Sequence, residues 1–223
     1  MSTTASPATT ESLQVLGLVG NPAPSSRTAR VTQHVVALVR DALGPTGTAG
    51  DIVELADHGG DPSVQVAVGD AHVLVVATPA YKGSYTGLLK LFLDTLAGDG
   101  LRETVVVPVV TAGSPVHATM TDLHLRWVLG ELGGSLPVPS VVLTERDLKA
   151  RDDVADAVGG WRDAHLAGVV AAVQAVASSR STTRSANDQA LAGTTSRSSP
   201  GSVISSSLRA SVPSSRRIMS ARA

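Results

Sequence analysis

Cysteine is absent from the 223 residues, and only 2% of them are aromatic. The absence of cysteine excludes disulfide bonds, thiol nucleophiles and thiolate metal sites, and it is compatible with a reducing cytoplasm. The few aromatic residues are Phe92, Trp127, Trp161, Tyr81 and Tyr85. So few rings offer no row of stacking platforms for single-stranded nucleic acids, and a buried core has to be built from Val, Leu and Ala.

Long hydrophobic runs are also missing. No apolar run approaches the roughly 20 residues needed to cross a bilayer, and residues 1–12 lack the charged start and apolar stretch of a secretory signal. Residues 1–177 carry 11 Lys and Arg against 18 Asp and Glu, whereas residues 178–223 carry 7 Arg against a single acid, Asp188. An acidic domain without a basic stripe is poorly suited to a phosphate backbone. We expect a cytoplasmic protein with neither a nucleic-acid nor a membrane partner.

Short apolar runs alternate with longer amphipathic segments from residue 13 onwards. Strands are predicted at residues 13–19, 51–55, 72–78, 104–111 and 138–143, and helices at about 27–43, 84–97, 115–133 and 147–177, with a shorter crossover around 62–69. Several strand candidates are apolar on both faces, which is typical of parallel strands covered by helices on each side. Pro108 weakens the fourth strand, because proline cannot donate to a ladder. The pattern predicts an α/β three-layer sandwich with a five-stranded parallel sheet, which binds ligands beyond the carboxyl ends of its strands.

The two ends of the chain lie outside this pattern. Residues 178–223 contain 15 serines in 46 residues and no hydrophobic period. Such a segment buries too little apolar surface to offset its ordering entropy. We therefore expect a disordered N-terminus at residues 1–12, a folded domain at 13–177 and a disordered Ser/Arg-rich tail at 178–223.

The first candidate binding loop, GNPAPSSRTAR (residues 20–30), joins the first strand to a helix. Its hydroxyls, its guanidinium and the free amides of a helix N-terminus suit a phosphate dianion. It matches neither GxxxxGK nor GxGxxG, which disfavours a P-loop nucleotidase and a standard dinucleotide fold. The alternative reading is that Ser25 or Ser26 caps the helix while Arg27 is solvated.

Two further loops follow the third and fourth strands. In TPAYKGSYTG (residues 78–87), a proline-stiffened turn that ends on Tyr81 offers backbone groups and an aromatic face to a flat ligand. In TAGSP (residues 111–115), small residues allow backbone amides to approach a ligand. Plain turns are the alternative, with Tyr81 packed on the domain and Ser114 as a helix cap. Three such loops at one edge of one sheet favour a shared ligand site.

GNPAPSSRT, TPAYKGSYTGLLKLFLD and VTAGSPVHATMTDLHLRWVLGELGG together resemble the NAD(P)H-dependent FMN reductases of flavodoxin-like fold. The likeness covers roughly residues 13–177 and is greatest to the reductases that supply two-component alkanesulfonate monooxygenases. It implies hydride transfer from NADPH or NADH to FMN, a flavin-dependent monooxygenase as partner, and a homodimer or homotetramer. The alternatives are an FMN-bound quinone or azo reductase and a flavodoxin-like electron carrier without nicotinamide turnover.

The same resemblance assigns site residues but no catalytic side chain, because the cofactors carry the chemistry of hydride transfer. It implies that Ser26, Arg27 and Thr28 hold the FMN phosphate. The other residues that it assigns to the cofactor are Asn21 in the first loop, Pro79, Ala80, Tyr81 and Lys82 beside the isoalloxazine, and Thr111, Ala112, Gly113 and Ser114 on its pyrimidine side.

Three other patterns carry less weight. His117 and His124 share a predicted helix face, but neither HExxH nor a nearby carboxylate completes a metal site, so no metal is predicted. A GxSxG elbow is missing, which disfavours a serine hydrolase. Trp127 and the apolar residues around it predict core packing of the helix at 115–133, with a subunit interface as the alternative.

Overall fold

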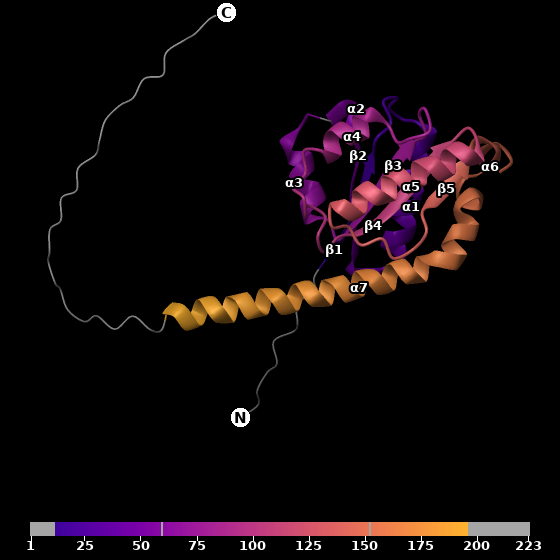
Figure 1. Ribbon diagram of the computed structural model, residues 1–223. Coiled ribbons are helices and arrows are strands. Elements are labelled where there is room, and N and C mark those ends of the chain that lie inside the picture. Colours follow the sequence, from indigo (N-terminus) through magenta and orange to yellow (C-terminus); the bar gives the residue numbers. More distant parts are fainter. Residues whose placement is uncertain (1–11, 59, 152, 196–223) are drawn as a thin grey trace, which may run out of the picture. The chain divides into compact units, whose positions relative to one another are not determined.

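A five-stranded parallel sheet of order β2-β1-β3-β4-β5 lies at the centre of the computed structural model, which describes residues 12–58, 60–151 and 153–195 (Figure 1). The strands are β1 (Leu13–Val19), β2 (Gly47–Glu54), β3 (Val73–Pro79), β4 (Val105–Ala112) and β5 (Val141–Thr144). This is the strand order of the flavodoxin-like fold, whose ligands bind where the order reverses, at β1 and β3. The predicted fold class is therefore confirmed.

Helices cover both faces of the sheet. They are α1 (Arg27–Ala42), α2 (Leu55–His58), α3 (Pro62–Asp70), α4 (Gly87–Leu93), α5 (Pro115–Glu131), α6 (Glu145–Lys149) and α7 (Val154–Thr195), with a 3-10 turn, η1 (Gly44–Thr46), after α1. The short crossover expected around residues 62–69 is α3. None of the helices in the described chain combines the length and the apolar character that a membrane span requires.

Two apolar layers result from the alternation of side chains along the strands. Val15 and Val75 pack in the layer that includes buried residues of α1 and α7, whereas Leu16 and Leu74 pack in the layer beneath α3, α4 and α5. Every side chain of β3 and β4 is buried. Strands that are apolar on both faces are explained by this double cover.

Pro108 is accommodated inside β4 because the ladder between β4 and β5 does not extend to its position. The amide of Val106 donates to Ser135 O on that side, and the ladder with β5 resumes only at Val109. A position two residues after Val106 faces the same side. Pro108 therefore lies between the two paired regions, where its missing N–H costs no ladder hydrogen bond.

The C-terminal helix differs from its prediction in two ways. The helix expected at residues 147–177 is divided into α6 and α7, and α7 continues to Thr195, so residues 178–195 are helical rather than disordered. Extending an existing helix avoids the cost of nucleation, and each added residue gains one backbone hydrogen bond. Residues 1–11 and 196–223 of the predicted disordered ends lie outside the described residues.

Arg180 fastens this extension to the body of the domain. Its Nη2 donates to Ala71 O at 3.4 Å, and its Nε lies 3.5 Å from Glu103 Oε2, with the Arg180 side chain only 14% exposed. The chain divides into two compact units after Arg184, so this contact lies within the first.

Replacing Arg180 by alanine should lower the free energy of unfolding by about 1 kcal/mol, because one backbone hydrogen bond and one partly buried ion pair are lost. Urea denaturation measures the change. Arg162→Ala is the matched control, since Arg162 lies on the same helix and forms its ion pair with the exposed neighbour Asp163. Equal stability of the two variants would show that Arg180 does not anchor α7.

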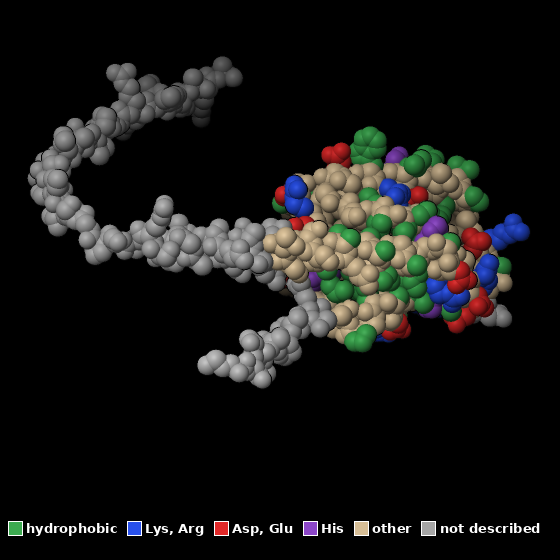
Figure 2. Space-filling model, turned by 90° about the horizontal axis from the view of Figure 1, so that it is seen from below, with side chains coloured by type: hydrophobic (Ala, Val, Ile, Leu, Met, Phe, Trp, Pro, Cys, Tyr) green, Lys and Arg blue, Asp and Glu red, His purple; other side chains and the backbone are tan. Residues whose placement is uncertain are grey.

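Charged side chains gather at one end of the face seen in Figure 2, on the side of the molecule that carries α6 and the start of α7. This end adjoins the loops that follow the strands.

Candidate functional site

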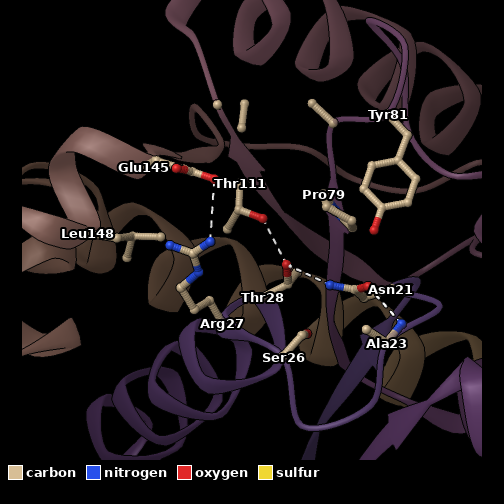
Figure 3. A pocket seen from close by; sticks show the side chains of 13 residues that line it. Asn21, Ala23, Ser26, Arg27, Thr28, Pro79, Tyr81, Thr111, Glu145 and Leu148 are labelled. Atoms are coloured by element: carbon tan, nitrogen blue, oxygen red, sulfur yellow. Dashed lines mark hydrogen bonds and ion pairs between the residues drawn. The ribbon is translucent and has the colours of Figure 1, made fainter.

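A pocket of about 310 Å³ lies at the carboxyl ends of β1, β3 and β4 (Figure 3). Its lining residues are Asn21, Ala23, Ser26, Arg27, Thr28, Pro79, Ala80, Tyr81, Thr111, Ala112, Gly113, Glu145 and Leu148. Ten of the twelve residues expected to bind the cofactor are among them. The structure therefore brings the three loops together at one rim, as the parallel sheet predicted.

The β1–α1 loop (residues 20–26) is held by its own polar groups. Asn21 Oδ1 accepts a hydrogen bond from the Ala23 amide at 2.9 Å, a local turn that short amide side chains favour. Ser26 is the N-cap of α1 and accepts from the Ala29 amide at 3.2 Å. Ser25 has φ 52° and donates its amide to Glu54 at 2.9 Å. Ser26 thus caps the helix and lines the pocket at the same time.

A chain of buried hydroxyl groups crosses the floor of the pocket. Asn21 Nδ2 donates to Thr28 Oγ1 at 3.3 Å, and the hydroxyls of Thr28 and Thr111 lie 2.7 Å apart (Figure 3). These contacts connect the β1–α1 loop and α1 to β4. They fix the side of the pocket nearest the N-terminus of α1.

Arg27 lies at the mouth of the pocket rather than free in solvent. Its Nη2 is 3.3 Å from Glu145 Oε1 of α6, and Lys149 Nζ lies 3.1 Å from the other Glu145 oxygen. The hydrogen bond from Lys149, together with the charges of Lys149 and Arg27, lowers the pKa of Glu145. Arg27 is therefore not simply solvated, as the alternative interpretation held. It forms an ion pair in which the arginine side chain is 48% exposed.

The loop after β3 folds into a tight turn that presents Tyr81. Tyr81 and Ser84 exchange two backbone hydrogen bonds, and Lys82 and Gly83 between them both have positive φ. Positive φ at both central residues is the requirement of a type I′ turn, which glycine meets easily. Tyr81 is 49% exposed and borders the pocket, so it does not pack into the domain, whereas Lys82 lies outside the pocket lining.

The loop after β4 is short and built of small residues. Thr111, Ala112 and Gly113 line the pocket, and the carbonyl of Thr111 accepts the Ala80 amide at 2.7 Å, which joins this loop to the preceding one. Ser114 accepts from the His117 amide at 3.4 Å and caps α5. Ser114 therefore caps α5, as the alternative interpretation held, and it is not among the residues that line the pocket.

Residues 13–149 match the sequence model of the family described as NADPH-dependent FMN reductase. The chain belongs to this family. The resemblance drawn from the three motifs is thereby confirmed.

The chain was compared with individual members of the family and with solved structures. FMN reductase (NADPH) of Pseudomonas putida is 41% identical over 68 residues, which cover 30% of this chain and 34% of the relative. NADH-dependent FMN reductase SfnF of Pseudomonas fluorescens is 34% identical over 128 residues, which cover 51% of this chain and 67% of the relative. The apo form of an NADH:FMN oxidoreductase (EMOB) aligns with a TM-score of 0.56 and 29% identity over 74% of this chain and 88% of that chain.

Sequence reasoning missed three pocket residues, Ala23, Glu145 and Leu148. Ala23 lies within the first motif but carries no polar group that would single it out. Glu145 and Leu148 come from α6, which follows β5. A signal was available, because the fifth strand of a parallel sheet ends at the same edge as the others.

The outer face of α5 is exposed, although core packing was predicted for this helix. Trp127 is 73% exposed and Leu123 63% exposed, whereas Leu125 and Leu129 are fully buried. The predicted core packing of Trp127 is therefore wrong, because only the stripe that contains Leu125 and Leu129 faces the sheet. Trp127 and Leu123 instead border an open groove of about 500 Å³, lined by Ser84, Tyr85, Leu123, His124, Trp127 and Val128.

The histidines do not form a metal site in the described part of the chain. No three His, Asp or Glu side chains there are grouped to hold an ion. His124 Nδ1 lies 3.2 Å from Ser84 Oγ. His124 therefore lines the groove beside Trp127.

Proposed function

We propose that the chain binds FMN in the pocket at the carboxyl edge of the sheet and reduces it with NADPH or NADH. The observation that carries this proposal is the convergence of a guanidinium, two hydroxyls and a helix N-terminus at one end of the pocket with a flat, small-residue wall at the other. Membership of the FMN reductase family supports the same assignment.

The α1 end of the pocket fits the phosphate of FMN. Ser26, Arg27 and Thr28 lie at the start of a 16-residue helix whose first turn contains no acidic residue. Free backbone amides and the helix dipole at such an end favour a dianion, and a guanidinium adds a charge-assisted contact. We therefore assign the phosphate to these three residues, with Asn21 holding the loop in shape.

The opposite end fits a planar ring system. Pro79, Ala80 and Tyr81 form one wall, and Ala112 and Gly113 present backbone with little side chain on the other. When bound, FMN would supply the group that accepts the electron pair of the hydride. The residues of the chain position the two rings against each other, and no side chain of the pocket is required as a general acid or base.

The enzyme activity is tested by following nicotinamide absorbance at 340 nm with the full chain. Oxidation that accelerates and saturates with added FMN supports the proposal, whereas FMN bound without oxidation would support an electron carrier. Oxidation that needs a quinone or azo dye, and does not respond to free FMN, would indicate tightly held flavin and a different acceptor.

Glu145 faces the proposed phosphate position, so it should weaken FMN binding. Its carboxylate neutralises Arg27 and repels a dianion. Replacing it by glutamine should tighten FMN binding about two- to fivefold, the range expected for an exposed charge pair. Fluorescence titration measures the change, with Asp163→Asn as a control of equal charge far from the pocket lining. Weaker binding would mean instead that Glu145 holds Arg27 in its binding position.

The acceptor of the reduced flavin is proposed to be a flavin-dependent monooxygenase. The half-exposed Tyr81 leaves the ring end of the pocket open, which suits a flavin that leaves after reduction. FMN that is lost on gel filtration and regained on addition would support this role, whereas retained FMN would contradict it.

A homodimer or homotetramer is proposed to form over the outer face of α5. Val116, Met120, Leu123 and Trp127 are exposed there, and contiguous apolar surface of this kind marks interaction sites. Light scattering tests the assembly, and Trp127→Glu should shift it toward monomer. A monomeric wild-type chain would contradict the proposal.

A further inference from the structure

Thr86 is a buried polar residue at the start of α4 that is hydrogen-bonded to the ends of two strands, β1 and β3. It is only 3% exposed, and it is not among the residues that line the pocket. As the N-cap of α4, its hydroxyl accepts a hydrogen bond from the Leu89 amide at 3.1 Å. A buried hydroxyl outside the pocket acts on a ligand only through the residues that it holds in place.

The hydroxyl of Thr86 holds the loop that follows β1. It donates its hydrogen to the carbonyl of Gly20, a buried residue. The next residue, Asn21, lines the pocket and donates to Thr28 at the phosphate end. A threonine hydroxyl has a single hydrogen to donate, so the contact with Gly20 depends entirely on this group. A shift of Gly20 therefore displaces the residues that are assigned to the phosphate.

The backbone amide of Thr86 holds the end of β3. It donates to Thr78 Oγ1 at 3.2 Å, and the Thr78 hydroxyl in turn donates to the carbonyl of Pro79 at 3.0 Å. Thr78 is fully buried, whereas Pro79 belongs to the pocket wall that is assigned to the flavin ring. Thr86 therefore connects the loop at the phosphate end of the pocket to the wall at its ring end.

We propose that Thr86 is a positioning residue for the flavin and sets the spacing between the phosphate site and the ring wall. The inference rests on the proposed function, which places the phosphate and the ring at these two ends of the pocket. A binding site keeps its geometry when the residues behind it are themselves fixed by packing and hydrogen bonds. One buried residue that is bonded to both loops fixes them relative to each other, which separate contacts to each loop would not do.

The test compares Thr86→Val and Thr86→Ser with the wild-type full chain by calorimetric titration of FMN and of riboflavin. Valine keeps the size of threonine without its hydroxyl, whereas serine keeps the hydroxyl. Thr86→Val should raise the Kd for FMN about three- to tenfold, as the loss of a buried hydrogen bond to the phosphate loop requires, and the Kd for riboflavin less. Thr86→Ser should keep both Kd values within about twofold of the wild type.

Two further variants separate positioning from stability. Thr78→Val removes the acceptor of the Thr86 amide at the ring end, so it should raise the Kd values of FMN and riboflavin equally, about two- to fivefold. Thr104→Val is the matched control, because Thr104 is fully buried and its hydroxyl donates to the carbonyl of Ala71 at 3.2 Å at the opposite end of the sheet. It should lose stability in urea denaturation but leave both Kd values unchanged.

The other outcomes overturn the inference. Unchanged Kd values in Thr86→Val, equal weakening of both flavins there, or a loss that Thr86→Ser does not restore would each exclude the positioning role. The same weakening in Thr104→Val would show an effect of global stability. If circular dichroism shows that Thr86→Val does not fold, Thr78→Val decides, and unchanged riboflavin binding in it refutes the inference. A wild-type chain that binds no FMN refutes the proposed function, whereas wild-type binding that these variants leave unaffected refutes this inference alone.

Discussion

Replacing Arg27 by alanine should weaken FMN binding about ten- to a hundredfold, the effect of losing a charge-assisted phosphate contact worth roughly 1.5–3 kcal/mol. Arg27 is the cation of the larger pocket, and its removal also leaves the charge of Glu145 facing the phosphate with Lys149 as its remaining ion-pair partner. Both effects act in the same direction. Calorimetric titration of FMN into the wild type and the variant measures the change.

Riboflavin provides the control for this result, because it carries the same ring system without the phosphate. Its Kd should be nearly the same in the wild type and in Arg27→Ala. Arg27→Lys should recover part of the FMN affinity, since it restores the charge but not the fork of donors. An FMN Kd that does not respond to Arg27→Ala would return Arg27 to the solvated start of the helix.

Replacing Gly20 by alanine should cost about 1–3 kcal/mol of stability and reduce FMN binding with it. A Cβ at this position would lie 2.5 Å from Cβ of Leu89, an atom that cannot rotate away because it is bonded to the backbone of α4. The loop cannot yield easily either. The Gly20 amide donates to Ala77 O at 2.7 Å, and the Gly20 carbonyl accepts the hydroxyl of Thr86.

Gly87→Ala is the matched control for Gly20→Ala. Gly87 is the first residue of α4, and a Cβ there would meet no heavy atom within 4 Å. It should leave stability unchanged or raise it slightly, because alanine loses less backbone entropy than glycine in a helix. Denaturation midpoints that are equal for Gly20→Ala and the wild type would show that the β1–α1 loop is not wedged against α4.

The sheet was predictable because its central strands are apolar at nearly every position on both faces. VLVVATP and VVVPVVTA show no alternation, which leaves a parallel strand between two helical layers as the simplest packing. The candidate site followed from the same argument. Once the strands are parallel, the loops after β1, β3 and β4 must meet, and ten of the twelve expected residues do line one pocket.

The remaining features depended on tertiary packing that the sequence pattern does not encode. The helix α5 is apolar over more than one stripe, so the sequence did not say whether Trp127 or Leu129 would face the sheet. The five-residue α6 is too short to show a hydrophobic period, so the only sequence signal for its pocket residue Glu145 was its place just after the fifth strand. The sequence of residues 178–195 shows no hydrophobic period, but these residues extend a helix that already begins at Val154.

The phosphate of FMN is proposed to bind at the N-terminus of α1, and the role of Arg27 depends on that contact. Parallel calorimetric titrations of FMN and riboflavin into the full chain test it directly. One FMN per chain should bind, at least about tenfold more tightly than riboflavin, because riboflavin lacks the charged group that accepts the hydrogen bonds. An absence of FMN binding, or equal affinity for the two flavins, would contradict it.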